Sequence, residues 1–355
     1  MQRYPAFLLC AVLALLCAAH SATAASDNQG AFAAQHSATA ASLQALEPQC
    51  IADDAGKRIC LPAPARRIVP LYAGLGEMLS ALGLEDSVVG RTASDDALPA
   101  SLPVVGTHMR PNPEIIVGLD PDLVVQFEGR EEAGQSAVAL ERLGLRVARF
   151  RIASFEDMFS CLRRLATLAG VAPRAEALER SLRGRLDAVA ARTAKADARL
   201  FAKNLAKNAT SASANSSASR AERAVPRIFF EIRYPNLLGA GAGGIAHDII
   251  VKAGGVNSLG HFAGRVVRVS EETLVANEPD IYLVQQGPMN KDPLLPKKRP
   301  HFKRLRSVSG GYSLLVDEST YSRPGPRNVD AVEELARLID VWRANPPGGF
   351  VASDK

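Results

Sequence analysis

Arginines and aromatic side chains gather in loops that follow predicted strands, and together they could bind a large, flat or anionic ligand. Aromatic rings would stack on the ligand, and arginines would donate charge-assisted hydrogen bonds to it. In open parallel sheets, ligands bind outside the carboxyl ends of the strands, which is where these loops begin. Any single residue of this kind could instead be ordinary polar surface, because arginine and tyrosine are common in loops. The candidate ligand-binding residues are Tyr72, His108, Met109, Arg110, Phe127, Arg130, Arg233, Tyr234, Tyr321 and Arg323, with Gln285 and Gln286 in a further loop of this kind.

A glycine-rich run from Gly239 to Gly244 matches G-x-G-x-x-G, so a dinucleotide-binding site has to be considered. That fingerprint needs its first glycine at the end of a strand and an acid about 20 residues further on. Here seven residues carry the chain from Ile232 to Gly239, and residues 259–267 contain no acid. We favour a turn, or a loop that lets the backbone approach a ligand. A nucleotide-binding enzyme stays open as one alternative.

The chain contains none of the other common catalytic motifs. There is no G-x-S-x-G, no H-E-x-x-H and no P-loop. We therefore predict no catalytic residues, no metal ligands and no resident cofactor. His108, His247 and His261 could converge on a bare metal ion if two lobes faced each other, although their spacing does not require it. A receptor for a free transition metal is thus the other alternative.

The elements that position these loops contain an internal repeat. Residues 112–126 and 270–285 each begin with a good helix N-cap and continue with an acid, Glu114 or Glu272, at the second helical position. A Pro-Asp pair begins seven residues after each glutamate and ends the short helix, and the apolar run that follows is typical of a strand buried on both faces. The two units lie about 158 residues apart, too far for a solenoid. They predict two lobes built alike.

A second similarity between the two halves of the sequence concerns an acid in a helix. Glu77 precedes Gly83 by six residues, and Asp248 precedes Gly254 by six residues. Each acid lies near the start of a helix that follows the first strand of its half.

Predicted strands alternate with predicted helices on both sides of one long helical segment, residues 174–199. This order indicates an α/β fold with two lobes, each a mainly parallel sheet flanked by helices, joined by one long helix. Residues 203–223 are polar and of low complexity, so they cannot bury enough apolar surface to order. The predicted boundaries are 1–24 for a signal peptide, 25–48 for a flexible leader, 49–172 for the N-terminal lobe, 173–200 for the linking helix, 201–225 for a low-complexity insertion and 226–345 for the C-terminal lobe.

The N-terminal sequence predicts export. Arg3 precedes an apolar run over residues 6–19, and residues 22–24 (ATA) have the small-x-small form of a cleavage site, as in a secretory signal peptide. Cys17 follows a leucine, which is unfavourable for lipoprotein processing. We therefore favour a soluble exported protein over a lipid-anchored one.

Composition and charge limit the class of partner. The chain has 355 residues, of which 47% are apolar, and its net charge is +5. The length favours two domains with a sizeable core. Acids and bases are interleaved along almost the whole chain, so no nucleic-acid partner is predicted.

Three of the five cysteines remain after export, because Cys10 and Cys17 lie in the signal peptide. Cys50 and Cys60 flank a strand–turn–strand pattern, and in an oxidising compartment they could form a disulfide across the hairpin. A metal-thiolate site is less well supported, since no further cysteine or histidine lies nearby in the sequence. Cys161 sits in an apolar helical pattern and is predicted to be core.

A series of motifs, taken in order from Cys50 to Ala344, resembles the periplasmic binding proteins that serve ABC importers of ferric siderophores, vitamin B12 and haem. The motifs are the DDAG hairpin followed by LPAPARRIV, then GEMLSALGLEDSVVG, NPEIIVGLDPDLVV, DIIVKAGGVN, SEETLVANEPDIYLV and SRPGPRNVDAVEELA. Proteins of this family have two α/β lobes joined by one long helix, with the ligand between the lobes. The resemblance implies a monomeric periplasmic receptor, not an enzyme, that delivers a metal chelate to the membrane permease of an ABC importer.

The resemblance also implies roles for particular residues. In such proteins one exposed glutamate per lobe, at the positions matching Glu114 and Glu272, meets arginines of the transporter subunits. A carboxylate in the first turn of a helix is also favourable by itself, by about 0.3–1 kcal/mol, which is the purely structural explanation. The arginines of the strand-end loops favour an anionic ferric siderophore as the ligand, then haem, then cobalamin. For haem, His108 or Tyr72 is the candidate iron ligand.

The sequence departs from this family in two places. The loop THMRPNPE lacks the aromatic residue that vitamin B12 binders place near His108, and the low-complexity insertion follows the linking helix. The sequence alone does not name the chelate.

Overall fold

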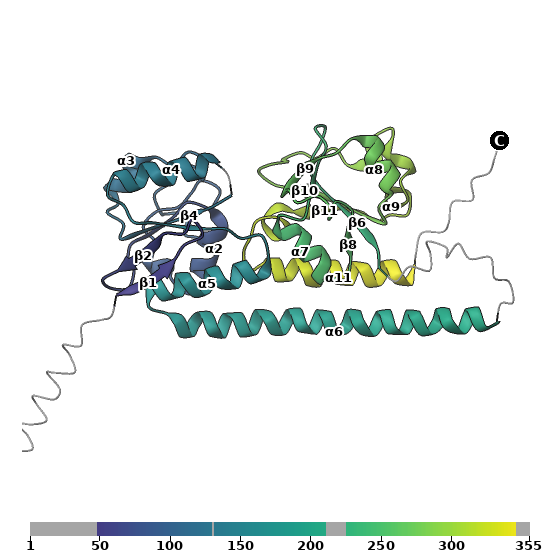
Figure 1. Ribbon diagram of the computed structural model, residues 1–355. Coiled ribbons are helices and arrows are strands. Elements are labelled where there is room, and N and C mark those ends of the chain that lie inside the picture. Colours follow the sequence, from purple (N-terminus) through teal and green to yellow (C-terminus); the bar gives the residue numbers. More distant parts are fainter. Residues whose placement is uncertain (1–47, 130, 211–224, 346–355) are drawn as a thin grey trace, which may run out of the picture. The chain divides into compact units, whose positions relative to one another are not determined.

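The computed structural model describes residues 48–129, 131–210 and 225–345 (Figure 1). The predicted signal peptide, almost all of the predicted leader, Arg130 and residues 211–224 lie outside the described residues. Among the described helices, none is long and apolar enough to cross a membrane.

The N-terminal lobe is a small α/β unit. Its elements are β1 (Gln49–Ala52), β2 (Arg58–Leu61), β3 (Ile68–Pro70), α2 (Ala73–Ala81), the 3-10 turn η1 (Glu85–Ser87), α3 (Pro113–Gly118), β4 (Leu123–Phe127), α4 (Glu131–Arg142), β5 (Val147–Phe150) and α5 (Phe155–Ala169). Three parallel strands form the sheet in the order β3-β4-β5. One face of this sheet packs against α2 and α5, and the other packs against α3 and α4. The strands are apolar on both faces because helices cover both sides.

The hairpin of β1 and β2 contains the predicted cysteine pair. Cys50 and Cys60 are directly opposite each other and form a disulfide bond, with an S–S distance of 2.08 Å. Asp54, in the turn of the hairpin, pairs with Arg164 of α5 at 2.8 Å and so attaches the hairpin to the lobe. Cys161 is a free thiol buried in α5, which confirms its prediction as core.

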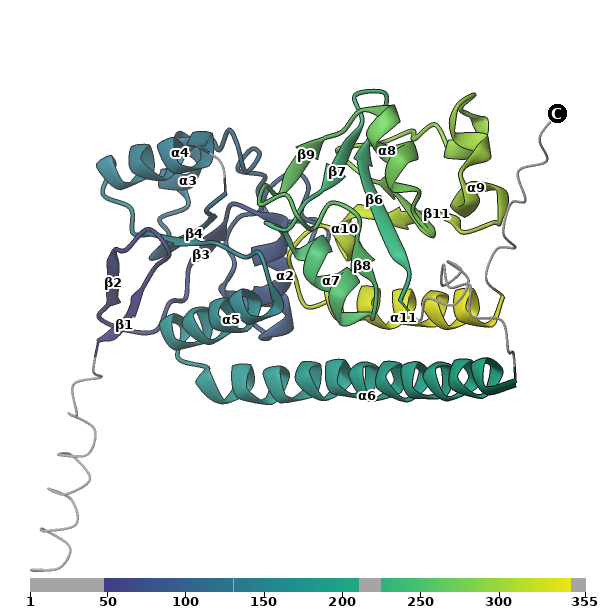
Figure 2. The same cartoon turned by 45° about the vertical axis from the view of Figure 1, so that its right-hand side comes forward.

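The C-terminal lobe has a larger sheet. Its elements are β6 (Arg227–Arg233), β7 (Leu238–Ala240), α7 (Ile245–Lys252), β8 (Val256–Asn257), β9 (Val266–Arg268), α8 (Glu271–Asn277), β10 (Ile281–Gln286), η3 (Pro296–Lys298), η4 (Phe302–Arg304), α9 (Arg306–Ser309), β11 (Ser313–Asp317), α10 (Glu318–Tyr321) and α11 (Asn328–Ala344). The strand order is β11-β10-β6-β7-β9, with β8 also paired to β6; Figure 2 shows β9, β7 and β6 side by side. Strands β11, β10 and β6 are parallel, as predicted, and β8, which was not predicted, is parallel to β6, whereas β7 and β9 are antiparallel additions. The sequence analysis treated these additions as loops, because β7 and β9 are three residues long and too short to show a period.

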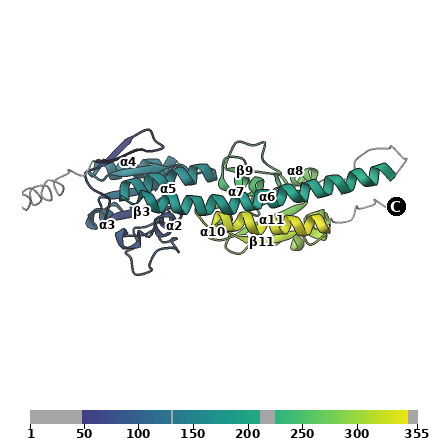
Figure 3. The same ribbon diagram turned by 90° about the horizontal axis from the view of Figure 1, so that it is seen from below.

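A single long helix, α6 (Ala172–Thr210), joins the two lobes, as predicted (Figures 1 and 3). It packs against α5 of the N-terminal lobe and against α7 and α11 of the C-terminal lobe. The helix continues beyond residue 200, so the prediction that residues 203–210 do not order is wrong. Alanine and lysine make up half of residues 203–210, and their high helix propensity does not need a buried apolar face.

One apolar core extends through both lobes. A single cluster of buried side chains includes Leu75 and Phe159 of the N-terminal lobe, Leu182 of α6, and Ile228 and Leu335 of the C-terminal lobe. Two smaller clusters fill the opposite faces of the two sheets. Because burial of apolar surface contributes about 25 cal/mol per Å², separating the lobes would cost free energy.

The predicted repeat has the same local structure in both lobes. The side chain of Asn112 accepts the backbone N–H of Glu114 at 3.0 Å, and the hydroxyl of Ser270 accepts the backbone N–H of Thr273 at 3.1 Å. Both residues are N-caps, of α3 and α8, and both satisfy N–H groups that the short helices cannot satisfy themselves. Glu114 and Glu272 are the second residues of their helices, as predicted.

The Pro-Asp pairs of the repeat connect strands within each lobe. Asp122 accepts the backbone N–H of Arg67 at 3.1 Å, and Asp280 accepts the backbone N–H of Arg227 at 2.8 Å. Arg67 precedes β3, and Arg227 is the first residue of β6. Asp122 therefore fixes the start of β4 against β3, and Asp280 fixes the start of β10 against β6.

A buried ion pair connects strand β6 of the C-terminal lobe with a residue of the segment that follows β10. The guanidinium of Arg299 binds both carboxylate oxygens of Glu231, at 2.6 and 2.7 Å, and the two side chains are 1% and 0% exposed. The hydroxyl of Tyr282 donates to the same carboxylate at 2.5 Å. A buried charge is tolerated when its partners are all present, so this cluster is sensitive to the loss of any one of them.

We predict that Arg299→Met lowers the free energy of unfolding by about 3–5 kcal/mol, because it leaves the carboxylate of Glu231 buried without its cation. The double variant Glu231→Leu/Arg299→Met should recover much of this loss. Urea unfolding followed by circular dichroism measures both. The matched control is Arg304→Met, an exposed neighbour, which should stay within about 0.5 kcal/mol of the wild type. A loss in Arg299→Met no larger than in the control would contradict the role of the pair.

Candidate ligand-binding cleft

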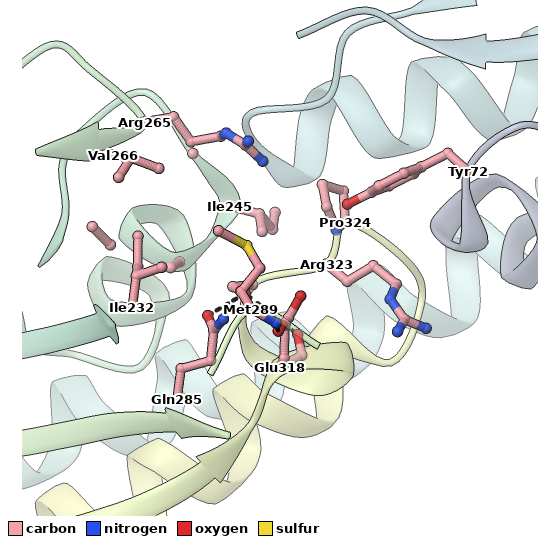
Figure 4. Close-up of a pocket in the computed structure, with 14 residues that line it drawn as sticks. Tyr72, Ile232, Ile245, Arg265, Val266, Gln285, Met289, Glu318, Arg323 and Pro324 are labelled. Atoms are coloured by element: carbon pink, nitrogen blue, oxygen red, sulfur yellow. Dashed lines mark hydrogen bonds between the residues drawn. The ribbon is translucent and has the colours of Figure 1, made fainter. Parts of the chain in front are cut away.

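Three neighbouring cavities share lining residues at the place where the two lobes meet. Their volumes are about 50 Å³, 360 Å³ and 20 Å³. Arg265 lines all three, Tyr72 lines the first and third, and Phe127 lines the second and third. We therefore describe them as one cleft, whose first cavity is shown in Figure 4.

The N-terminal lobe contributes an aromatic wall to the cleft. Tyr72 follows β3 by two residues, and Phe127 is the last residue of β4, so both lie at the carboxyl ends of parallel strands. Their rings stack with centroids 4.6 Å apart, and the ring of His108 meets Tyr72 edge-on at 5.6 Å. Met109 lines the same small cavity. Such a wall can pack against a flat or apolar part of a ligand.

The hydroxyl of Tyr72 points into the first cavity (Figure 4). Burial raises the pKa of Tyr72 to about 12 and outweighs the opposite effect of Arg265 and Arg323. The phenol therefore keeps its proton at neutral pH, and it can donate a hydrogen bond to an oxygen of a ligand.

Arg265 brings a positive charge to the part of the cleft that all three cavities share. Its guanidinium lies 6.0 Å from the ring centroid of Phe127, in the other lobe. Among the described residues, no carboxylate lies within ion-pairing distance of it, so its charge is available to a ligand. Arg265 was not among the candidate residues, because the strand β9, whose pairing with β7 positions it, is only three residues long and too short to show a period.

A second arginine of the cleft, Arg323, already has a partner in the protein. It pairs with Asp96 of the N-terminal lobe at 2.7 Å, and its side chain is 9% exposed. Asp96 also pairs with Arg327 at 3.4 Å. The charge of Arg323 is thus compensated by Asp96, whereas no described residue compensates the charge of Arg265.

Polar groups of the C-terminal lobe complete the first cavity. The side-chain oxygen of Gln285 accepts the hydroxyl of Ser322 at 2.6 Å, and its Nε2 is buried without a hydrogen-bond partner among the described residues. The carboxylate of Glu318 accepts the backbone N–H of Met289 at 2.9 Å. Since buried donors are almost always paired, Nε2 of Gln285 is well placed to donate to a ligand.

Two of the predicted aromatic residues lie outside the cleft. The ring of Tyr234 covers the guanidinium of Arg299 at 3.8 Å, beside the buried ion pair. Tyr321 is 3% exposed and packs against Phe230 in the shared core. Tyr234 follows β6, where the chain turns back into the antiparallel strand β7. Tyr321 follows β11 and is the last residue of α10, which places its side chain in the core.

The predicted arginines are divided between the cleft and the surface. Arg110 and Arg233 are exposed and line none of the three cavities, so we leave them out of the site. Arg130 lies outside the described residues. The predicted residues that the structure brings to the cleft are Tyr72, His108, Met109, Phe127 and Arg323, together with Gln285.

The glycine run does not form the turn of a dinucleotide-binding site. Its first residue, Gly239, belongs to the antiparallel strand β7. A Cβ on Gly241 would lie 2.2 Å from the carbonyl oxygen of Gly264, so the glycine allows two backbone segments to touch. This close packing supports the segment that carries Arg265, and it gives the nucleotide alternative no support.

The histidines considered for a bare metal ion have separate surroundings. The Nδ1 atom of His247 lies 3.3 Å from the amide nitrogen of Asn257, and the ring of His261 lies 4.1 Å from that of Phe262. His108 belongs to the aromatic wall. Within the part of the chain that the structure describes, no group of three or more His, Cys, Asp or Glu side chains could hold a metal ion.

Comparison with known protein families agrees with this architecture. Residues 68–299, more than half of the chain, match the family described as periplasmic binding protein. The chain therefore belongs to the periplasmic binding protein family, and the resemblance found in its sequence is confirmed.

Individual relatives show how far the similarity extends. The uncharacterized ABC transporter substrate-binding lipoprotein YvrC of Bacillus subtilis (strain 168) is 25% identical over 297 residues, covering 82% of this chain and 85% of that protein. The vitamin B12-binding protein BtuF of Vibrio cholerae is similar in structure, with a TM-score of 0.61, 20% identity, and coverage of 78% of this chain and 98% of that chain. An ABC-type Fe3+-hydroxamate transport protein of Saccharomonospora viridis DSM 43017 has a TM-score of 0.61 and 21% identity, covering 82% and 99% of the two chains. The heme-binding protein RhuT of Roseiflexus sp. RS-1 has a TM-score of 0.58 and 21% identity, covering 78% and 98%. At these identities, the structural comparisons show the shared two-lobe fold.

Two carboxyl groups beside the cleft have raised pKa values because they are buried. Burial raises the pKa of Glu77 from 4.5 to about 7, although Arg327 and Arg323 act in the opposite direction. Burial likewise raises the pKa of Asp95 from 3.8 to about 6. Both groups therefore bind protons more tightly in the folded protein than in the unfolded chain.

We predict that the free energy of unfolding of the wild type, relative to that of Glu77→Gln, increases as the pH falls from about 7 to about 4.5. The stability contributed by Glu77 is fully present below its unfolded pKa of 4.5 and is lost as the pH rises through its folded pKa of about 7. Across this window the difference should be on the order of 2–3 kcal/mol.

Urea unfolding at a series of pH values measures this difference. Glu176→Gln, at an exposed position of α6, is the matched control and should show no such dependence. A difference between wild type and Glu77→Gln that does not vary with pH would show that the Glu77 carboxyl does not titrate in this range.

Proposed function

We propose that this chain is an exported periplasmic substrate-binding protein, monomeric and without catalytic activity. It captures a metal chelate in the cleft and delivers it to the membrane permease of an ABC importer. The observation that carries the proposal is that Arg265, which has no carboxylate partner among the described residues, lines all three cavities. Membership of the periplasmic binding protein family supports it, as do relatives whose names describe binding and transport.

We propose an anionic ferric siderophore as the ligand, with haem second and cobalamin third. The fork of an arginine guanidinium suits carboxylate, catecholate or propionate oxygens. The Nε2 atom of Gln285 and the hydroxyl of Tyr72 offer further donors to such oxygens. Among the described residues that line the first cavity, Glu318 is the only acid, and its carboxylate accepts a backbone N–H. The cavity therefore favours a ligand that is rich in acceptor oxygens.

Titration with four chelates tests the proposal: a ferric tris-catecholate, a ferric tris-hydroxamate, haemin and cyanocobalamin, followed by absorbance and tyrosine fluorescence. The tris-catecholate should bind most tightly, because it is anionic whereas a tris-hydroxamate of similar size is not. Tight binding of cobalamin without a response to any ferric chelate or haemin would contradict the proposed ligand order. A lack of response to all four would contradict the function. NAD(P) should give no fluorescence change, which separates this function from the nucleotide alternative.

Arg265→Gln should weaken binding of the ferric tris-catecholate by about 1.5–3 kcal/mol, roughly ten- to a hundredfold, because a hydrogen bond to a charged group is lost. Isothermal titration calorimetry measures the affinity. Arg268→Gln is the matched control, since Arg268 is exposed on the same strand region and lines none of the three cavities. If Arg265→Gln and Arg268→Gln bind the ferric tris-catecholate with equal affinity, Arg265 does not take part in ligand binding.

If haemin binds, Tyr72 is the first candidate for the iron ligand, because its hydroxyl points into the first cavity (Figure 4). His108, at the edge of the Tyr72 ring, is the second candidate. Tyr72→Phe should then shift the haem absorption band, and His108→Ala should shift it less. An unchanged band in Tyr72→Phe would exclude the phenol as the ligand.

Glu114 and Glu272 form the proposed contacts with the permease. Both are exposed at the second position of their helices, and each is followed three residues later by an exposed valine, Val117 at 44% and Val275 at 47%. The two lobes thus offer equivalent positions to a partner with two similar subunits. We propose that each glutamate meets an arginine of one permease subunit.

Glu114→Ala and Glu272→Ala should leave ligand affinity and folding nearly unchanged, and they should reduce stimulation of the importer's ATPase, most strongly in the double variant. Loss of one side of a desolvated charge pair costs about 2–5 kcal/mol, well above the capping effect. ATPase assays with the cognate importer in nanodiscs measure the effect, with Glu176→Ala as the exposed control. Variants that lose the ligand but still stimulate the importer would place the glutamates in the binding site instead.

A further inference from the structure

Glu77 and Asp248, which occupy equivalent positions in the two halves of the sequence, each bind the start of a helix in the opposite lobe. Glu77, on α2 of the N-terminal lobe, accepts the backbone N–H of Arg327 at 2.8 Å, where α11 of the C-terminal lobe begins. Asp248, on α7 of the C-terminal lobe, accepts the backbone N–H of Phe155 at 2.8 Å, where α5 of the N-terminal lobe begins. The two contacts are therefore reciprocal between the lobes.

A carboxylate at the start of a helix accepts a hydrogen bond from a backbone N–H that has no acceptor within the helix. The first N–H groups of a helix have no acceptor within it, and the positive end of the helix dipole favours an anion. Helix α11 has no side-chain cap at its own N-cap residue, so Glu77 of the other lobe supplies one. Helix α5 has a capping box of its own, formed by Ser154 and Asp157, to which Asp248 adds a further acceptor.

The contact at Glu77 is the more deeply buried of the two. Its side chain is 9% exposed, and its second oxygen lies 2.9 Å from Nε of Arg327. A Cβ on Gly325 would lie 2.7 Å from the Glu77 carboxylate, and a Cβ on Gly74 would lie 2.1 Å from the carbonyl oxygen of Pro324. Helix α2 and the segment before α11 therefore touch at Gly74, where only glycine fits, and at Gly325, where a larger residue would displace the Glu77 carboxylate. Asp248 is only partly buried.

The contact at Glu77 also lies next to the cleft. Residues 322–324, a few positions before Arg327, line the first cavity. The side chain of Asn328, the first residue of α11, donates to the carbonyl oxygen of Arg323 at 3.0 Å, so this segment is tied to the start of the helix. A shift of α11 relative to α2 would therefore move Arg323 in the cleft. Asp248 lines none of the three cavities.

We propose that Glu77 and Asp248 are reciprocal caps between the lobes, and that Glu77 is a positioning residue for ligand binding because it fixes the segment that carries Arg323. The capping role of Glu77 and Asp248 is inferred from the contacts alone. The positioning role of Glu77 rests on the proposed function. The caps add two polar contacts between the lobes to the shared apolar core and the linking helix.

Amide hydrogen exchange tests the caps without any ligand. In Glu77→Ala, the amide of Arg327 and the first turn of α11 should exchange at least tenfold faster, while the start of α5 stays unchanged. In Asp248→Ala, the amide of Phe155 at the start of α5 should exchange faster, while the start of α11 stays unchanged. This effect should be smaller, because the capping box of α5 remains. Glu77→Gln keeps a carbonyl acceptor but loses the charge, so it should show an intermediate rate and remains usable if Glu77→Ala does not fold. If the amide of Arg327 exchanges at the wild-type rate in Glu77→Ala, or in Glu77→Gln where Glu77→Ala does not fold, Glu77 does not cap α11.

Binding of the ferric tris-catecholate tests the positioning role. Glu77→Gln should raise the Kd about tenfold through faster dissociation, whereas Asp248→Asn and the control Glu176→Gln should change it less than twofold. If the wild type binds and Glu77→Gln binds equally well, the positioning role is wrong even if the exchange experiment supports the caps. If the wild type binds none of the four chelates, the proposed function fails and the positioning role falls with it, while the exchange result still decides the caps.

Discussion

The cleft depends on one constraint: the carboxyl ends of the parallel strands in both lobes must face the same space. Phe127 ends β4 of one lobe and Gln285 lies near the end of β10 of the other, and both line the cleft. The lobes hold this arrangement because they share an apolar core along α6 and because Glu77 and Arg323 bind partners across the boundary. Apolar burial supplies most of the free energy, and the polar contacts fix which atoms meet.

Charged groups around the cleft are divided between joining the lobes and receiving a ligand. Arg323 and Arg327 pair with Asp96 and Glu77, so their charges are compensated inside the protein. Arg265 has no such partner among the described residues. An anionic ligand can therefore bind Arg265 without breaking an ion pair of the protein, and charge interactions are stronger in a partly buried cleft than in water. This division is the physical reason for preferring an anionic chelate over a neutral one.

The fold could be predicted from the sequence because its signals are local: N-caps, Pro-Asp pairs and apolar strands repeat in both lobes. The cleft could be predicted only where a residue follows a parallel strand directly, as Tyr72 and Phe127 do. Arg265 was missed because two three-residue antiparallel strands carry it, and such strands leave no period in the sequence. The equal spacing of Glu77 and Asp248 from the following glycines could be seen in the sequence. The role of the two acids could not be predicted, because each binds a residue of the other lobe that is far away in the sequence.

A crystal structure of the complex with a ferric tris-catecholate, with the iron located by its anomalous scattering, tests the central claim most directly. The account predicts that the iron lies between the lobes and that ligand oxygens lie within about 3 Å of the guanidinium of Arg265, with the aromatic wall of Tyr72 and Phe127 on one side of the chelate. An iron position outside the cleft, or a chelate in the cleft that does not contact Arg265, would contradict it.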